Sequence, residues 1–257
     1  EPNLQNIPVR SPLGREMRKF FVARDGYVLV DADYSQIELR VLAHISGDRN
    51  MIKAFNDNTD IHTVTASEVF DMPPQLVTPI MRSRAKAVNF GIVYGIGAFS
   101  LAKDIGVSRS EADEYIKGYL RHYSGVDKYM HDVVEKAKKD GYAETMFARR
   151  RYLPELTASN ANTRAFGERV ARNMPIQGTA ADIIKIAMIR VYERLERENL
   201  AAKLIMQVHD ELIVEAPENE KERVSALLKE EMENAVKLSV ALTADVHSGR
   251  TWYDAKG

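Results

Sequence analysis

LVDADYSQIELR, residues 29–40, joins a strand-like apolar run to a helical pattern. The apolar run, Tyr27 to Val30, ends in two aspartates, Asp31 and Asp33, and apolar residues then recur at helical spacing over 36–46. A carboxylate between a buried strand and a helix is either a cap or a metal ligand. This stretch alone leaves both interpretations open, and a ligand would need a second carboxylate elsewhere in the chain.

The composition excludes several classes of protein. With 257 residues, 45% of them hydrophobic and 28% charged, the chain has the usual mix of a soluble globular protein of one large or two ordinary domains. It contains no run of about 18 apolar residues, so we expect no membrane span. The absence of cysteine excludes disulfides and zinc–thiolate sites and fits a reducing cytoplasm. The first ten residues, EPNLQNIPVR, have no signal-peptide pattern and no initiator methionine, so we expect a processed chain or an excised fragment.

The overall charge does not indicate a nucleic-acid-binding protein. Lys and Arg number 36 against 37 Asp and Glu, which gives a formal net charge of −1. Affinity for phosphates would have to come from local clusters, such as RKF (18–20), MRSRAK (81–86) and ARRRY (148–152). A charge run taken alone is more often a solvated face.

The remaining pattern predicts a helical middle between segments that contain strands. Helices are predicted at 36–46, 60–70, 78–94, 109–122, 125–139, 159–198 and 219–237, and strands at 27–33, 142–147 and 240–247. Pro175 predicts a break or a start within the long helical stretch. KLIMQVHDELIVEAP (203–217) predicts a β-hairpin whose turn carries His209, Asp210 and Glu211. We therefore expect an α+β fold with a sheet platform and a helical lobe.

The hairpin supplies a candidate partner for Asp33. Burying carboxylates between apolar runs is costly unless something neutralises them. If the strand that ends at Asp33 neighbours the hairpin, Asp33 and Asp210 share one edge of the sheet, and each raises the pKa of the other unless a cation lies between them. Oxygen ligands without a His or Cys cluster indicate Mg²⁺, and two such ions about 4 Å apart are usual in phosphoryl transfer. A capping Asp33 and a turn-forming Asp210 remain the alternative.

The segment 77–95 predicts a helix with a basic and aromatic stripe. Thr78 is a suitable N-cap, and Pro79 suits the first helical position. Residues four apart lie on one slanted face of a helix. The stripe consists of Arg82, Lys86, Phe90 and Tyr94. Two cations followed by two aromatic rings suit a ligand with phosphates at one end and a planar base at the other, although a basic face over an aromatic core edge is the simpler alternative.

Taken together, these stretches resemble the polymerase core of family A DNA polymerases. DYSQIELR (33–40) resembles the motif A of that family, the pattern from Arg82 to Gly95 resembles motif B, and QVHDE (207–211) resembles motif C. NMPIQGTAAD (173–182) and DIHTVTA (60–66) also match. The resemblance covers essentially the whole chain, in the order and spacing of the family.

The resemblance implies a right-hand polymerase architecture. It assigns an antiparallel palm sheet to 1–45 and 141–257 and a helical fingers insertion to 46–140. The thumb and exonuclease domains would precede residue 1, so we expect the thumb to be absent. An arginine-containing segment that family members carry just before EPNLQN is also absent, and Ala148 replaces a common glycine.

The resemblance implies template-directed DNA synthesis, in which deoxynucleotides are added to a primer 3′-hydroxyl and pyrophosphate is released. Asp33 and Asp210 would bridge two Mg²⁺ ions, with the Tyr34 carbonyl as a further ligand. Asp31 matches no ligand position and is interpreted as structural, and Glu211 is an accessory carboxylate. Primer–template DNA and deoxynucleoside triphosphates would be the partners of a monomer in the bacterial cytoplasm, associated with the nucleoid.

The same resemblance assigns contacts with the two substrates. The nucleotide would be bound by Gln36, Glu38, His62, Arg82, Lys86, Phe90 and Tyr94. Among these, Arg82, Lys86 and His62 would contact phosphates, and Lys86 would either protonate pyrophosphate or act by charge alone. Glu38 would crowd a ribose 2′-hydroxyl. DNA would be contacted by Gln5, Asn6, Asn173, Gln177, Gln207 and His209, since amides suit the degenerate pattern of minor-groove acceptors.

Three other functions compete with DNA synthesis. A single-subunit RNA polymerase shares much of this pattern, but such relatives usually have Tyr in place of Phe90 and lack Glu38. A non-catalytic nucleic-acid-binding remnant would not need the carboxylate pair. A nuclease that uses two metal ions would not need the stripe from Arg82 to Tyr94.

Overall fold

The computed structural model describes residues 3–7 and 12–256, which form two compact units. The sheet unit contains the described residues up to Ile37, together with Ala181–Lys237 and the described residues from Leu242. The helical unit contains Glu38–Ala180 and Leu238–Ala241. As the sequence predicted, the chain combines helices with antiparallel sheet.

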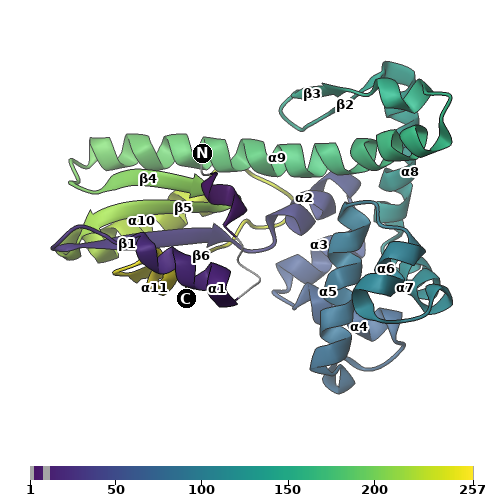
Figure 1. Ribbon diagram of the computed structural model, residues 1–257, viewed down its shortest axis with the longest axis horizontal. Coiled ribbons are helices and arrows are strands. Elements are labelled where there is room, and N and C mark those ends of the chain that lie inside the picture. Colours follow the sequence, from purple (N-terminus) through teal and green to yellow (C-terminus); the bar gives the residue numbers. More distant parts are fainter. Residues whose placement is uncertain (1–2, 8–11, 257) are drawn as a thin grey trace. The chain divides into compact units, whose positions relative to one another are not determined.

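An antiparallel sheet of four strands, in the order β4-β5-β1-β6, forms the centre of the sheet unit (Figure 1). Its strands are β1 (Tyr27–Tyr34), β4 (Lys203–Val208), β5 (Glu211–Pro217) and β6 (Ala244–Gly249). Because β1 is an inner strand covered on both faces, it is a nearly continuous buried run rather than an alternating one. The predicted hairpin is confirmed: β4 and β5 pair, and His209, at φ 51°, and Asp210 connect them.

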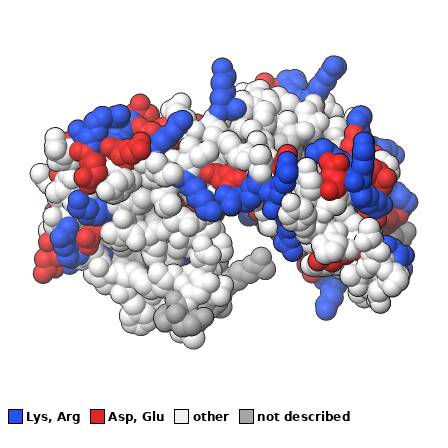
Figure 2. All heavy atoms as spheres, turned by 90° about the horizontal axis from the view of Figure 1, so that it is seen from above, with Lys and Arg blue, Asp and Glu red and all other residues white. Residues whose placement is uncertain are grey.

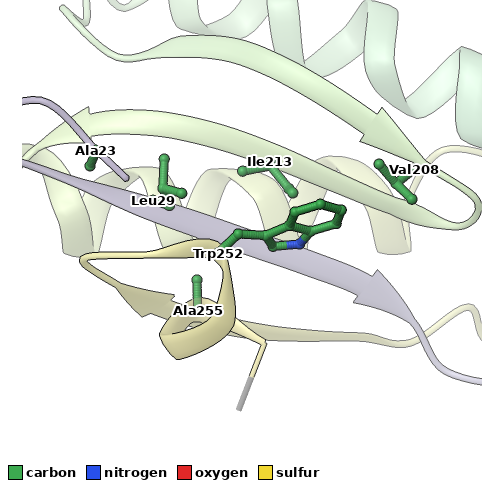
Figure 3. Close-up of a cluster of buried hydrophobic side chains, with 6 residues drawn as sticks. All are labelled: Ala23, Leu29, Val208, Ile213, Trp252 and Ala255. Atoms are coloured by element: carbon green, nitrogen blue, oxygen red, sulfur yellow. The ribbon is translucent and has the colours of Figure 1, made fainter. Parts of the chain in front are cut away.

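The side chains of β1 alternate between two faces of the sheet. On one face, the Tyr34 hydroxyl donates to the Met232 carbonyl of α10 (Lys221–Glu233) at 2.6 Å. On the other face, Leu29 packs with Ile213 of β5 and with Trp252 of α11 (Trp252–Ala255), as Figure 3 shows. Asp31 and Asp33 follow Leu29 at spacings of two, so they lie on the Trp252 face.

The N-terminal described residues add short elements to the sheet unit. These are the 3-10 helices η1 (Leu4–Asn6) and η2 (Met17–Phe20) and the helix α1 (Pro12–Glu16). A further 3-10 turn, η5 (Glu218–Glu220), precedes α10. The end of η2 and α11 lie together, since the Phe21 ring meets Trp252 edge-on at 5.3 Å.

The helical unit confirms the helices predicted at 36–46, 60–70, 78–94, 109–122 and 125–139 and adds two. It contains α2 (Ile37–Ser46), α3 (Arg49–Asn56), α4 (Ile61–Val69), η3 (Pro74–Leu76), α5 (Pro79–Val93), α6 (Ala98–Ile105), α7 (Arg109–His122) and α8 (Ser124–Asp140). The short helices α3 and α6 were not predicted separately. Asp48 caps the start of α3, and Gly106, at φ 67°, ends α6 in the left-handed region that glycine favours.

The predicted break at Pro175 is wrong. Helix α9 (Ala161–Arg197) runs through Pro175 for 37 residues. A proline inside a helix removes one backbone hydrogen bond and costs about 3 kcal/mol. Ala171 and Ile176, on either side of it, are both 0% exposed, so tertiary packing holds the helix where local propensity would end it.

The two compact units divide the chain at other positions than the predicted boundaries between palm and fingers, 45/46 and 140/141. The assignment of palm and fingers stays a prediction. The segment after α8 forms a small sheet of β2 (Tyr142–Glu144) and β3 (Arg150–Tyr152), followed by η4 (Pro154–Thr157). Ala143 and Leu153 of this segment share one core with Val134 of α8 and Ala171 of α9. Hydrophobic packing therefore keeps it with the helical unit.

None of the described helices is long and apolar enough to cross a membrane.

Candidate active site

The sheet unit brings the two predicted aspartates to one edge of the sheet. Asp33 lies near the end of β1, and Asp210 lies in the turn between β4 and β5. The Tyr34 N–H donates to the Asp210 carbonyl at 3.2 Å, which ties the strand end to the turn. Burial, and then the charge of Asp33, raises the pKa of Asp210 to about 7. The negative charge of Asp33 therefore disfavours ionisation of Asp210.

Two further carboxylates join them, and we call Asp31, Asp33, Asp210 and Glu211 the acidic cluster. Asp33 and Glu211 are direct cross-strand partners, and Asp31 and Glu211 are only 2% and 4% exposed. Burial, and then the charge of Glu211, raises the pKa of Asp31 to about 7. The sequence assigned Asp31 a structural role and Glu211 an accessory one; their proximity follows from the strand register.

Lys256 supplies positive charge to the acidic cluster, and sequence analysis missed it. Its Nζ donates to Asp33 Oδ2 at 2.9 Å and also to Glu211 Oε2. Burial alone would lower the pKa of Lys256, but the charges of Asp31, Glu211 and Asp33 raise it well above its usual range. The segment around it, TWYDAKG, carries no recognisable site pattern, so only the fold reveals this contact.

The acidic cluster suits a hard cation. Asp33 Oδ1 and Asp31 Oδ2 are buried and accept no hydrogen bond from any described residue. Among the described residues no ready cage of three or more acidic, His or Cys ligands is found. Asp33, with its unpartnered Oδ1, and the neighbouring Asp210 offer carboxylate oxygens of the kind that Mg²⁺ binds. Mg²⁺ keeps several waters or substrate phosphates in its shell and needs few protein ligands. Asp33, Asp210 and the Tyr34 carbonyl are the groups that could hold it.

The helical unit carries the predicted basic and aromatic stripe on α5. As predicted, Thr78 caps the helix by accepting from the Met81 N–H at 3.3 Å, and Pro79 is its first residue. Arg82 and Lys86 are exposed, and Phe90 is half-buried. Tyr94, which was predicted within the helix, is its C-cap and is 46% exposed. Two cations and two aromatic rings thus remain accessible along one side of α5.

Arg82 is fixed by Asp60, the N-cap of α4. The guanidinium binds the carboxylate through Nε–Oδ2 at 2.5 Å and Nη2–Oδ1 at 3.2 Å. Burial would raise the pKa of Asp60, but hydrogen bonds from Arg82 and Thr63 lower it to about 2. The same carboxylate accepts from the His62 backbone N–H at 3.2 Å. One side chain therefore caps α4 and orients the first cation of the stripe.

His62 is neutral and almost wholly buried. It is 2% exposed, and burial lowers its pKa to about 4. Its Nδ1 lies 3.1 Å from the side-chain nitrogen of Asn89, whose oxygen accepts from Thr65 Oγ1 at 3.1 Å. Sequence analysis missed Asn89, which lies on the buried side of α5 beside the motif residues. Any phosphate contact by His62 would be a hydrogen bond from a neutral ring.

Glu38 and Tyr94, both predicted nucleotide contacts, bind one another. The Tyr94 hydroxyl donates to Glu38 Oε2 at 3.0 Å. Gln36, which belongs to the sheet unit, has a φ of 55°, in the left-handed region, where the chain turns from β1 towards α2.

The predicted DNA contacts fall into separate groups. In the sheet unit, Gln207 Nε2 donates to the His209 carbonyl at 2.6 Å, and His209 Nε2 lies 3.1 Å from the Gln5 carbonyl oxygen. In the helical unit, Asn173 Nδ2 donates to the Val93 carbonyl at the end of α5, at 3.2 Å. Asn6 and Gln177 are exposed on η1 and α9, respectively.

Comparison with known proteins assigns the chain to a class. The sequence model of DNA polymerase family A matches residues 1–254, which is nearly the whole chain. The chain therefore belongs to DNA polymerase family A.

Within that family, the chain is similar to bacterial DNA polymerase I. It is 54% identical to DNA polymerase I of Caldicellulosiruptor bescii over 256 residues and 53% identical to that of Bacillus subtilis (strain 168) over 257 residues, in each case with 100% of this chain covered. It spans only 30% and 29% of those proteins. A solved structure, the POL domain of Pol1 from M. smegmatis in complex with DNA primer-template and dNTP, superposes with a TM-score of 0.95 at 46% identity, over 100% of this chain and 45% of that one.

Proposed function

We propose that this chain is the nucleotidyl-transfer core of a DNA-directed DNA polymerase. It would add deoxynucleotides to the 3′-hydroxyl of a primer on a DNA template and release pyrophosphate. The observation that carries the proposal is the backbone bond between Tyr34 and Asp210, which joins motifs from opposite ends of the chain into one acidic edge. The solved relative that holds primer-template and dNTP supports the choice of substrates.

Asp33, Asp210 and the Tyr34 carbonyl are the proposed metal ligands, with Glu211 as an accessory carboxylate. Two Mg²⁺ ions, when bound there, would favour ionisation of the primer hydroxyl and neutralise the triphosphate charge. The protein's part is to hold two carboxylates side by side on a rigid strand and turn, at a repulsive cost that a cation relieves. The buried, unpartnered Oδ1 of Asp33 supports its role as a ligand.

The helical unit is proposed to bind the incoming nucleotide. Arg82, oriented by Asp60, and Lys86 would bind the phosphates, and Lys86 is the candidate proton donor to pyrophosphate. His62 would donate a hydrogen bond from its neutral ring. Phe90 would pack against the sugar and base, and Tyr94 would stack near the templating base. Gln36 and Glu38 complete the proposed nucleotide contacts, with Glu38 opposing a ribose 2′-hydroxyl.

The proposed DNA contacts are polar side chains that suit the minor groove. They are Gln5, Asn6, Asn173, Gln177, Gln207 and His209. Minor-groove acceptors occur in every base pair, so amides can follow the duplex without reading its sequence. The palm (1–45 and 141–257) and fingers (46–140) of a right-hand polymerase, a monomeric state and a place in the bacterial cytoplasm at the nucleoid belong to the same proposal.

Single-turnover primer extension with Mg²⁺ and one deoxynucleotide tests this function. Asp33→Asn and Asp210→Asn should each lower the rate by at least about a hundredfold, because each removes a charge that the cations require. Asp25→Asn, in the exposed turn before β1, is the matched control and should extend normally. Binding of DNA without any extension by the wild-type chain would favour a non-catalytic remnant. Unchanged rates in both variants would remove the metal-ligand assignment.

A further inference from the structure

Lys256 places one ammonium group among the carboxylates of the acidic cluster. Its Nζ contacts Asp33 Oδ2 at 2.9 Å and also Glu211 Oε2. The side chain is 30% exposed, whereas that of Glu211 is 5% exposed. Solvent therefore screens this contact only partly, and the charge of Lys256 acts directly on both carboxylates.

The fold fixes the segment that carries Lys256. Trp252, four residues earlier, is 0% exposed and lies in the sheet core beside Leu29, as Figure 3 shows. The Arg18 guanidinium stacks over the Trp252 ring at 4.4 Å from its centroid. Thr251 caps α11 by accepting from the Asp254 N–H at 3.2 Å. Lys256 is therefore held beside the cluster by an anchored helix.

The contacts divide the carboxylates into occupied and available oxygens. Both oxygens of Glu211 are bound: Oε1 accepts from Trp252 Nε1 at 3.1 Å, and Oε2 accepts from Lys256. Asp33 shares only Oδ2 with Lys256, while its buried Oδ1 has no partner among the described residues. Glu211 is thus withdrawn from a cation that Asp33 can still receive.

We propose that Lys256 is a positioning residue of the metal site. It neutralises Asp33 and Glu211 before a metal binds, competes with the incoming cation for Asp33, and keeps Glu211 out of the ligand set. This inference rests on the proposed function, in which Asp33 is a metal ligand. The ammonium group of Lys256 thus lets the acidic cluster fold without a metal, while Asp33 and Asp210 remain able to bind and release a metal ion.

Binding of Mn²⁺ to the full chain, without DNA or nucleotide, tests the competition. Electron paramagnetic resonance of free Mn²⁺ gives the affinity directly. Lys256→Met keeps the length of the side chain but removes its charge, and it should bind Mn²⁺ on the order of tenfold more tightly. Lys256→Arg should resemble the wild type. Lys221→Met, which removes a charge at the exposed start of α10, is the control and should not change the affinity.

Thermal unfolding in EDTA tests the neutralisation. Lys256→Met should unfold at a lower temperature than the wild type in EDTA, and Mn²⁺ should raise its unfolding temperature more than that of the wild type. The double variant with Glu211→Gln and Lys256→Met loses one charge of each sign. Its unfolding temperature in EDTA should return most of the way to that of the wild type. This double variant also provides a folded protein if the single variant does not fold.

The outcomes separate this inference from the proposed function. Equal Mn²⁺ affinity and equal unfolding temperatures in EDTA for wild type and Lys256→Met would overturn the role of Lys256, even if the wild type still binds Mn²⁺. If the double variant is the only one that folds, an unfolding temperature in EDTA close to that of the wild type supports the role, and a much lower one overturns it. Mn²⁺ binding that Asp33→Asn leaves unchanged would instead remove the metal-ligand premise, and the proposed function with it.

Discussion

Tyr94, at the end of α5, donates its phenolic hydrogen to Glu38 Oε2 at 3.0 Å. Glu38 lies in the first turn of α2, so this bond joins the start of α2 to the end of α5. A carboxylate held by one hydrogen bond keeps a defined position, and a side chain with a defined position can exclude a substituent of the substrate.

Glu38→Ala should therefore relax the choice of sugar. We expect the ratio of kcat/KM for ribonucleotides to that for deoxynucleotides to rise by at least about tenfold, because the space for a 2′-hydroxyl opens. Tyr94→Phe should produce a smaller rise, since Glu38 stays but loses its hydrogen bond. Base selection, measured on the same primer, is the control. An unchanged sugar ratio in Glu38→Ala would exclude Glu38 as the gate.

Asp60 should stabilise the protein in two separable ways. Asp60→Asn keeps a capping oxygen but loses the charge that pairs with Arg82. Because this ion pair is partly exposed, we expect the free energy of unfolding to fall by less than about 1 kcal/mol. Asp60→Ala also loses the cap and should cost about 1–2 kcal/mol. Urea unfolding of both variants measures the difference. Equal losses would show that the cap on α4 contributes nothing.

His62 should make the protein less stable in mild acid. Its pKa falls from an ordinary 6.5 to about 4 on folding, so between these values the unfolded chain binds the extra proton. Above pH 6.5 the His62 ring is neutral in both states and this effect is absent. As the pH falls from 6.5 towards 4, the free energy of unfolding decreases by about 1.4 kcal/mol per pH unit.

His62→Gln removes this titration and isolates it from other acidic groups. The free energy of unfolding of the variant, followed by urea titration from pH 7 to pH 4, should fall less steeply than that of the wild type. Parallel curves over this range would show that His62 is protonated in the folded protein as readily as in the unfolded chain.

Binding of primed DNA by this chain should depend only weakly on salt. The net charge is −1, and the face in Figure 2 shows basic and acidic side chains interspersed. Each phosphate that the protein neutralises adds about 0.9 to the slope of log affinity against log salt. We expect a shallower slope and weaker binding than for a longer family A polymerase. Fluorescence anisotropy of one primer–template across a salt series compares the two, and equal slopes would contradict the prediction.

Sequence periodicity located most elements because it records which face of each segment is buried. The apolar run at 27–30, the hairpin over 203–217 and the stripe on α5 were identified in this way. The same local signal failed at Pro175, where packing of Ala171 and Ile176 outweighs the proline. It also did not separate α3 and α6, which are eight residues each.

The sequence by itself named the candidate residues, since its patterns and their resemblance to family A DNA polymerases together singled out Asp33, Asp210 and the α5 stripe. Only the tertiary structure decided their partners. Strand register sets Glu211 opposite Asp33, and the fold brings Lys256 to Asp33 from the far end of the chain. Packing of α4 against α5 sets Asp60 against Arg82. Contacts between residues distant in sequence depend on register and packing, which no local pattern records.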